Sequence, residues 1–276
     1  MGGEHHEVAK SYLFIGVIFV VIGDNNKALE YFEKCLVIRL KTMGNEHPQV
    51  AEPYNNIGVI WHNKEDYVKA QDFYEKSLTI CLKNLGSEHP KVAMSYYNIG
   101  GICHNKGNFD KALEYYEKSL VVRIKTLGME HPDVASLYNN IGNSLFSKNE
   151  FDKSLEYFNK SLLIRLKTIG KENPEVASTF YNIGFVLKKM EKFDLAIKNF
   201  KRGFKIHNKG RYVIKIAQCY EELKNKEKSL EYFNKSAKIL LVDNGIDDKE
   251  TNEAIVNAKR LAKELNKENE LPKWII

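Results

Sequence analysis

The sequence has few cysteines and few prolines for its length. The 276 residues include four cysteines, which lie far apart and form no Cys-x-x-Cys pair: Cys35, Cys81, Cys103 and Cys219. This spacing indicates neither a disulfide framework nor a zinc site, and it favours a reduced, cytoplasmic protein. The six prolines and 17 glycines gather in no Pro-rich or Ser/Gly-rich stretch. The sequence therefore has no place for a flexible linker, and one continuous architecture is expected.

Motifs that bind nucleotides or activate nucleophiles are also missing. The chain has no phosphate-binding glycine-rich loop, no His-Glu-x-x-His pair and no Gly-x-Ser-x-Gly elbow. We therefore predict no catalytic residues, no cofactor and no enzyme activity. The net charge of +6 is spread along the chain, which is a weak argument for nucleic acid, and no nucleic-acid partner is expected.

One uncharged run stands near the N-terminus, from Tyr12 to Ile22. Its eleven residues fall short of the roughly 20 that a membrane span needs. The residues before it lack the positive charge of a signal peptide. No membrane partner is expected, and the run fits the internal repeat described next.

A repeat of 42 residues dominates the sequence. The string His47-Pro48-Gln49-Val50-Ala51 returns at residues 89–93, 131–135 and, with Asn173 in place of histidine, 173–177. Each proline suits the first turn of a helix, and a glycine four residues earlier ends the preceding helix. Every unit therefore contains two amphipathic helices. Histidines that repeat at this spacing would lie about 10 to 20 Å apart in stacked units, too far to share a metal ion, and we interpret them as loop and cap residues.

Small residues and rings alternate on the facing helix stripes. In the second unit Tyr54, Ile57 and Gly58 lie on one face of the first helix, and the second helix carries Tyr74 between two small residues. We expect the glycines of this stripe, such as Gly100, to lie where two helices meet and the ring to fill the gap.

These residues resemble the tetratricopeptide repeat, and the longer unit, which contains EHPxVA, YNNIG and KALEYYEKSL, is similar to the kinesin light chain subclass. The resemblance covers residues 5 to about 208 in five copies. It implies an all-α fold, a right-handed superhelical solenoid of antiparallel helix pairs. We predict a repeat array over residues 1–246, with five 42-residue repeats and one shorter repeat, and a C-terminal capping helix with a short tail over 247–276.

The same resemblance implies that the first helices line a concave groove for an extended peptide or a partner helix. Four asparagines stand two residues before the repeated glycine, namely Asn56, Asn98, Asn140 and Asn182. Each amide can hold a ligand backbone, or it can bond a neighbouring helix, and both uses can coexist. Lysine is absent three residues before the glycine, which disfavours a carboxylate clamp. The other groove candidates are Asn55, His62, Tyr97, His104, Asn139, Asn143, Tyr181, Lys188 and Lys189.

The first repeat departs from this pattern, with Phe14 in place of asparagine and Val17, Val20 and Val21 on the groove face. An apolar face of this kind needs a cover. Either repeats that precede it are missing, or this end docks a partner or a second copy. Two functions follow from the sequence: a protein-binding scaffold without catalysis, or the regulatory or sensor array of a larger signalling enzyme or motor-associated protein.

Overall fold

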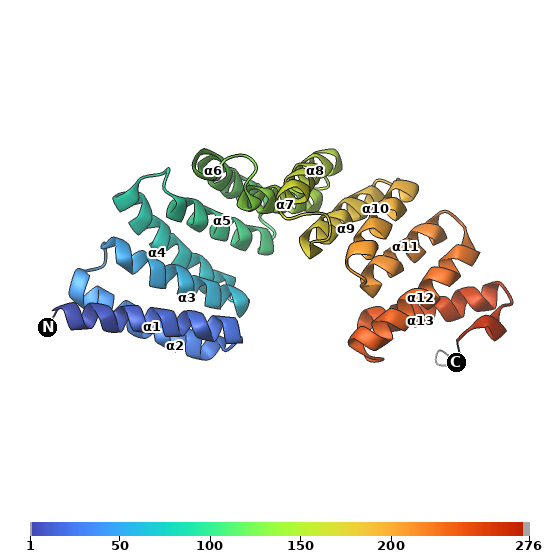
Figure 1. Cartoon of the computed structure of the whole chain (residues 1–276), viewed down its shortest axis with the longest axis horizontal. Helices are drawn as coiled ribbons and strands as arrows, with labels where there is room; N and C mark the ends of the chain where they lie inside the picture. Colours follow the sequence, from blue (N-terminus) through green and yellow to red (C-terminus); the bar gives the residue numbers. More distant parts are fainter. Residues whose placement is uncertain (1, 273–276) are drawn as a thin grey trace. The chain divides into compact units, whose positions relative to one another are not determined.

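A computed structural model describes residues 2–272 of the chain, and thirteen α-helices and two 3-10 turns make up its regular structure there. The predicted all-α class is confirmed. The chain divides into two compact units between Ser144 and Leu145, inside one helix. The boundary predicted after residue 246, between the repeat array and its capping helix, is of a different kind and stays a prediction. Figure 1 shows the helices of each unit in pairs.

The elements of unit 1 are α1 (Gly2–Ile22), α2 (Asn25–Met43), η1 (Pro48–Val50), α3 (Ala51–Asn63), α4 (Tyr67–Leu85), α5 (Pro90–Asn105), α6 (Phe109–Leu127) and most of α7 (Pro132–Ser147). Unit 2 contains the end of α7 followed by α8 (Phe151–Thr168), α9 (Pro174–Lys189), α10 (Phe193–Ile206), α11 (Gly210–Glu222), α12 (Lys226–Asn244), α13 (Lys249–Glu264) and η2 (Glu268–Glu270).

The repeated histidines cap the helices that follow them. His89 Nδ1 accepts a hydrogen bond from the backbone N–H of Lys91 at 3.1 Å, and His47 and His131 accept in the same way. Asn173, which replaces histidine in the fourth copy of the string, accepts from the N–H of Glu175 at 2.8 Å. The cap role predicted for these histidines is confirmed. Each bond satisfies a donor that the start of a helix leaves unpaired.

A glycine packs face to face with an aromatic ring at the centre of the helix pairs. A Cβ atom added at Gly58 would lie 2.7 Å from the ring of Tyr74, and one at Gly100 would lie 2.8 Å from the ring of Tyr116. The Tyr74 side chain is 1% exposed, so the ring has no free space to move into. The two helices can approach this closely because the glycine has no side chain, and the ring fills the remaining space.

Serines reinforce the same contact from the second helix of the pair. The hydroxyl of Ser77 on α4 donates to the carbonyl oxygen of Ala51 on α3 at 2.8 Å, and Ser119 on α6 donates to Ala93 on α5 at 2.7 Å. Both serines are buried. Their hydroxyls therefore have the hydrogen-bond partners that a buried polar group needs.

The last helix covers the open core of unit 2. α13 lies within residues 247–276, where the capping helix is predicted, and it packs Ala258 and Leu261 against Phe233 and Leu240 of α12. Asp248 accepts from the backbone N–H of Thr251 at 2.9 Å and begins the helix. The outer side of α13 carries charged residues, so the helix ends the packed layers with a polar surface.

α1 is longer than the uncharged run from Tyr12 to Ile22. By length and composition alone, its window His5–Ile22 is apolar enough to cross a membrane, with a mean hydropathy of 1.4, and 17% of that window is buried. The eleven-residue uncharged run is too short to span a membrane, but the 18-residue window is not. The length of the run is therefore no reason to expect no membrane partner. In this structure the buried side of α1 packs against α2, where Phe19 stacks on Tyr31.

Two neighbouring glycines of α5 test the close approach. Gly100→Ala places a methyl group against the buried Tyr116 ring, and we expect it to lower the free energy of unfolding by about 1–3 kcal/mol. Gly101→Ala is the matched control, because its Cβ would lie 3.7 Å from the nearest atom. That variant should gain about 0.5–1 kcal/mol from helix propensity. Urea denaturation of both variants decides the point, and equal midpoints would contradict it.

Candidate functional site

A row of hydrogen bonds joins the first helices of consecutive pairs in unit 1. The amide N–H of Asn98 on α5 donates to Asn55 Oδ1 on α3 at 2.9 Å. Asn140 on α7 donates to the hydroxyl of Tyr97 on α5 at 3.1 Å. Each bond joins residues 43 positions apart. α3, α5 and α7 therefore present one shared face within this unit.

This face contains a pocket of about 290 Å³. Five of the predicted groove residues meet here, and Tyr116 reaches the pocket from α6. The lining residues are His62, Tyr97, Asn98, Gly101, His104, Asn105, Tyr116 and Asn140.

Neighbouring side chains determine which ring nitrogen of each pocket histidine carries the proton when the imidazole is neutral. The Ser144 hydroxyl donates to the carbonyl oxygen of Asn140 at 3.1 Å, so it accepts from His104 Nδ1 at 2.9 Å. The Asn105 amide donates to His62 Nε2 at 2.9 Å, which leaves the proton of His62 on Nδ1. Burial lowers the pKa of both His62 and His104 because it disfavours the charged imidazolium.

The pocket keeps unused hydrogen-bonding groups of both kinds. Asn98 and Asn140 each spend one amide N–H on a neighbouring helix, which leaves the second N–H and the carbonyl oxygen. His104 offers Nε2 as an acceptor, and His62 offers Nδ1–H as a donor. Among the residues that line the pocket none is charged when the histidines are neutral. The site is suited to a neutral, polar segment of chain with alternating donors and acceptors.

The other predicted groove residues of unit 1 lie outside this pocket. Asn55 is 6% exposed and lies between α3 and α5, so it supports Asn98 from below the surface. Asn55 therefore lies beneath the groove face on which the sequence analysis placed it. Asn56, Asn139 and Asn143 are half-buried on their helices and do not line the pocket. Asn98 and Asn140 each bond the residue 43 positions earlier. The residue 43 positions before Asn56 is Leu13, whose side chain has no hydrogen-bond acceptor.

In unit 2 the predicted residues Tyr181 and Lys188 lie on α9, together with Asn182, which is half-buried, and Lys189, which is exposed. The Tyr181 ring meets the Tyr212 ring edge to face at 5.4 Å between centroids, and the Arg211 guanidinium lies 5.2 Å from the Tyr181 centroid. A cation over an aromatic face is an attractive contact. Arg211 is not among the predicted groove residues, because the sixth repeat follows the fifth at 33 residues and not at 42, so the repeat pattern did not place it.

Lys188 is half-buried and hydrogen-bonded, unlike a charge at an exposed rim. Its Nζ donates to Gln218 Oε1 at 2.6 Å, and the amide of Gln218 donates to Glu253 Oε1 at 2.7 Å. Desolvation lowers the pKa of Lys188. The positive charge expected near the fifth repeat is therefore tied into a network that ends at a carboxylate on α13.

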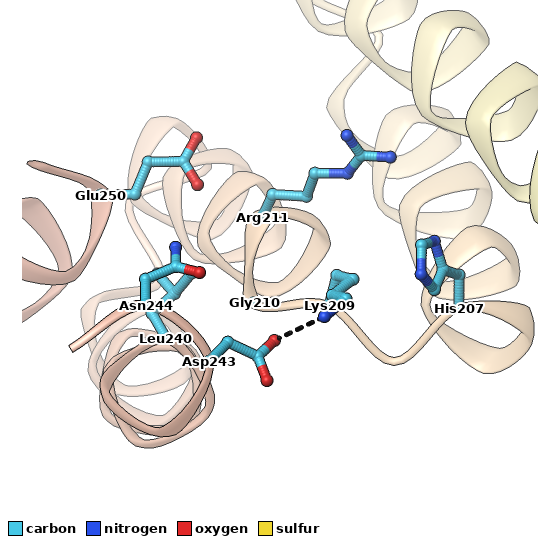
Figure 2. A pocket seen from close by; sticks show the side chains of 8 residues that line it. All are labelled: His207, Lys209, Gly210, Arg211, Leu240, Asp243, Asn244 and Glu250. Atoms are coloured by element: carbon cyan, nitrogen blue, oxygen red, sulfur yellow. Dashed lines mark hydrogen bonds and ion pairs between the residues drawn. The ribbon is translucent and has the colours of Figure 1, made fainter. Parts of the chain in front are cut away.

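A second pocket lies in unit 2, and Figure 2 shows the residues that line it. Its lining holds two cationic and two anionic side chains. Lys209 Nζ forms an ion pair with Asp243 at 3.2 Å, while the Arg211 guanidinium points away from Glu250. No group of three His, Cys, Asp or Glu side chains within the described part of the chain could hold a metal ion. The pocket is lined by His207, Lys209, Gly210, Arg211, Leu240, Asp243, Asn244 and Glu250.

Comparison with family models identifies the class of this fold. The tetratricopeptide repeat matches residues 7–83, 59–125 and 133–209, and a second model of the same repeat matches 210–239. The chain therefore belongs to the tetratricopeptide repeat family, and the shorter sixth unit is one of its repeats. A search of curated proteins returns no match.

Solved structures share the superhelical repeat fold at low sequence identity. The TPR-like repeats of a Podosopora anserina protein described as a kinesin light chain are 19% identical, with a TM-score of 0.63 over 73% of this chain and 95% of that one. BtubC (BKLC) from P. vanneervenii is 18% identical, with a TM-score of 0.67 over 83% and 92%. A chain of the APC/C hetero-tetramer Cut9-Hcn1 is 19% identical, with a TM-score of 0.67 over 92% of this chain and 43% of that one. The expected similarity to kinesin light chain repeats is confirmed at the level of the fold.

Substitution of two asparagines measures how much the bond between helices contributes to stability. Asn98→Ala leaves the buried Oδ1 of Asn55 without its donor, and we expect a loss of about 1–3 kcal/mol in unfolding free energy. Asn56→Ala is the control, because Leu13 stands at its partner position, and its cost should be a few tenths of a kcal/mol. Thermal and urea unfolding measure both. Equal losses would show that the bond to Asn55 contributes nothing.

The neutral histidines predict a loss of stability in mild acid. Their pKa is lower in the folded chain than the ordinary value of about 6.5, so the unfolded chain binds more protons below that pH. The contribution is complete above the ordinary pKa and is lost as the pH falls through the folded pKa. We expect the pH dependence to weaken in a His62→Gln, His104→Gln variant. Urea midpoints measured from neutral pH down to mild acid test this, and identical slopes in the two proteins would refute it.

Proposed function

We propose that the chain is a non-catalytic scaffold that binds an extended peptide or a helix of a partner protein along its first helices. Proteins of this family generally serve as protein-protein interaction scaffolds. The observation that carries the proposal is the uncharged pocket in unit 1, where Asn98, His104 and Asn140 keep free hydrogen-bonding groups.

The chemistry of the pocket favours recognition of a ligand's backbone. A peptide backbone offers one N–H and one carbonyl at each residue, and an asparagine amide can bond both. The Tyr97 and Tyr116 rings provide apolar contact beside these amides. No lysine or arginine lines the pocket, so a carboxylate-rich segment has no cation to bind there.

The four cysteines fit a reducing compartment, and we extend the proposal to the cytoplasm. All four are free and buried, and burial raises the pKa of each thiol. A buried thiol with a raised pKa is a weak nucleophile and is typical of a structural cysteine.

Peptide selection tests the proposed function directly. A phage-displayed library of random peptides is selected against the full chain, and the dissociation constant of the enriched peptide is measured by titration calorimetry. We expect Asn98→Ala with Asn140→Ala to weaken binding by about 1–3 kcal/mol for each unpaired backbone group. Asn159→Ala with Asn252→Ala, two exposed asparagines outside the pocket, is the matched control and should bind like the wild type.

A second variant separates binding from folding. Gly101→Leu adds a side chain inside the pocket, and its Cβ would make ordinary van der Waals contacts, at 3.7 Å from the Tyr116 hydroxyl and 3.9 Å from His62 Cε1. We expect this variant to melt like the wild type and to lose the peptide. Peptide affinity that is unchanged per folded molecule in both variants would remove the pocket from the mechanism.

A further inference from the structure

The outer side of α1 carries a stripe of apolar side chains that nothing covers within the described residues. Phe14 is 59% exposed, Ile18 56% and Val21 83%. These residues follow one another at helical spacing, so they share one face. The opposite face packs against α2, where a Cβ at Gly16 would lie 2.5 Å from the Phe32 ring. α1 is therefore folded onto unit 1 by one side and open on the other.

Two positions of this helix, those of Val8 and Ile18, are completely buried in the later repeats. Val8 and Ile18 are 41% and 56% exposed, whereas Val50 and Ile60, which stand 42 residues later, are both 0% exposed. Val92 and Ile102 in the next repeat are also 0% exposed. Each of these later first helices follows the second helix of the repeat before it, and α1 has no such helix before it among the described residues. At Val8 and Ile18 the open side of α1 therefore has the apolar residues of a surface that another helix covers.

The polar end of the same face matches an arginine-binding pair elsewhere in the chain. On α9, Thr179 Oγ1 accepts from Arg165 Nη1 at 2.7 Å, and Glu175 Oε2 lies 3.1 Å from Arg165 Nη2. Arg165 comes from the last turn of α8 and is 7% exposed. This guanidinium is thus a buried cation held by the Glu175 carboxylate, the Thr179 hydroxyl and the backbone carbonyl oxygen of Glu175, which accepts from Nη1 at 3.2 Å.

Glu7 and Ser11 of α1 occupy the places of Glu175 and Thr179 in the repeat. Ser11 Oγ donates to the carbonyl oxygen of Glu7 at 2.9 Å, just as Thr179 Oγ1 donates to that of Glu175 at 2.8 Å. Glu7 and Ser11 are both exposed, and no described side chain bonds the Glu7 carboxylate. The acceptor pair is built in α1 without the arginine that fills it in α9.

We propose that this face of α1 binds an amphipathic helix of a partner protein, which places an arginine against Glu7 and Ser11 and apolar residues against Ile18 and Val21. The partner helix runs antiparallel to α1. This direction follows from α8 and α9, where the arginine at the end of one helix meets the acceptors at the start of the next. The surface is distinct from the pocket of the proposed function.

The charges of α1 favour such a helix over a lipid surface or a second copy. Glu7 lies on the apolar face and Asp24 follows the helix, whereas interfacial helices carry basic residues toward anionic lipids. In a symmetric antiparallel pair of α1 helices centred on Phe14, Glu7 would face Val21 of the other copy. A carboxylate buried against an apolar side chain without a partner is unfavourable.

The probe is a labelled peptide with the sequence of α8, residues 151–168, which carries Arg165. A hydrocarbon staple between positions 159 and 163, both exposed in α8, keeps the isolated helix folded. Fluorescence anisotropy with the full chain should show saturable binding. Ile18→Asp should weaken it about tenfold or more, because one apolar side chain loses its burial. Val242→Asp, at an 82% exposed valine of α12, is the control and should bind like the wild type.

A charge exchange tests the arginine. Glu7→Arg should weaken the stapled peptide about fivefold, and a peptide with Arg165→Glu should bind that variant more tightly than it binds the wild type. Absence of saturable binding to the wild type, or equal binding to Ile18→Asp, would overturn the proposal. So would a concentration-dependent dimer that Ile18→Asp dissociates in sedimentation, or flotation of the wild type with phosphatidylcholine and phosphatidylserine vesicles. These results leave the pocket at His104 untouched, so the two proposals fail separately.

Discussion

The close approach of a glycine to an aromatic ring sets the distance between the two helices of a pair, and the remaining contacts depend on it. Gly58 against Tyr74, Gly100 against Tyr116 and Gly184 against Phe200 repeat this contact with nearly the same spacing. Because the backbones are this close, a serine on the second helix reaches a carbonyl oxygen on the first, as Ser119 reaches Ala93. The shorter sixth repeat has Ala217 at the glycine position, and Ala217 shares a buried cluster with the Phe233 ring.

In unit 1 the charged side chains lie mainly on the second helices, and the pocket on the shared face of α3, α5 and α7 is lined by uncharged polar groups. The second helices carry exposed ion pairs between residues four apart, such as Lys76 with Asp72 at 2.6 Å and Lys118 with Glu114 at 2.6 Å. The first helices carry amides, tyrosines and neutral histidines. Exposed pairs add little to stability but keep the outer face soluble. A ligand on the shared face would be bound through hydrogen bonds and shape complementarity, which salt screens much less than it screens ion pairs.

The repeat period predicted most of the fold, and five of the groove candidates that it indicated line one pocket, but it did not predict the bonds between them. Pro90 and Gly86 mark helix boundaries in the sequence, and the stripe with Gly100 placed the core correctly. The bond from Asn98 to Asn55 could not be predicted, because it depends on how far one helix is rotated against the next. The same limit hid Arg165, since its acceptors Glu175 and Thr179 lie across a boundary between repeats. Gln218 and Arg211 were missed because the last repeat changes its offset.

The bonds across the inner face of unit 1 restrict how this sequence can change over generations. Three of them join a residue to the one 43 positions earlier, as Asn140 is joined to Tyr97 and Asn105 to His62, and His104 is joined to Ser144 across 40 positions. A single inserted or deleted residue within a helix would break the register of every such bond on that helix at once. Exchange of one side chain for another disturbs only its own partner. Relatives of this chain that acquire new ligands should therefore differ by substitution at constant unit length, and length variation should be confined to the turns between helices.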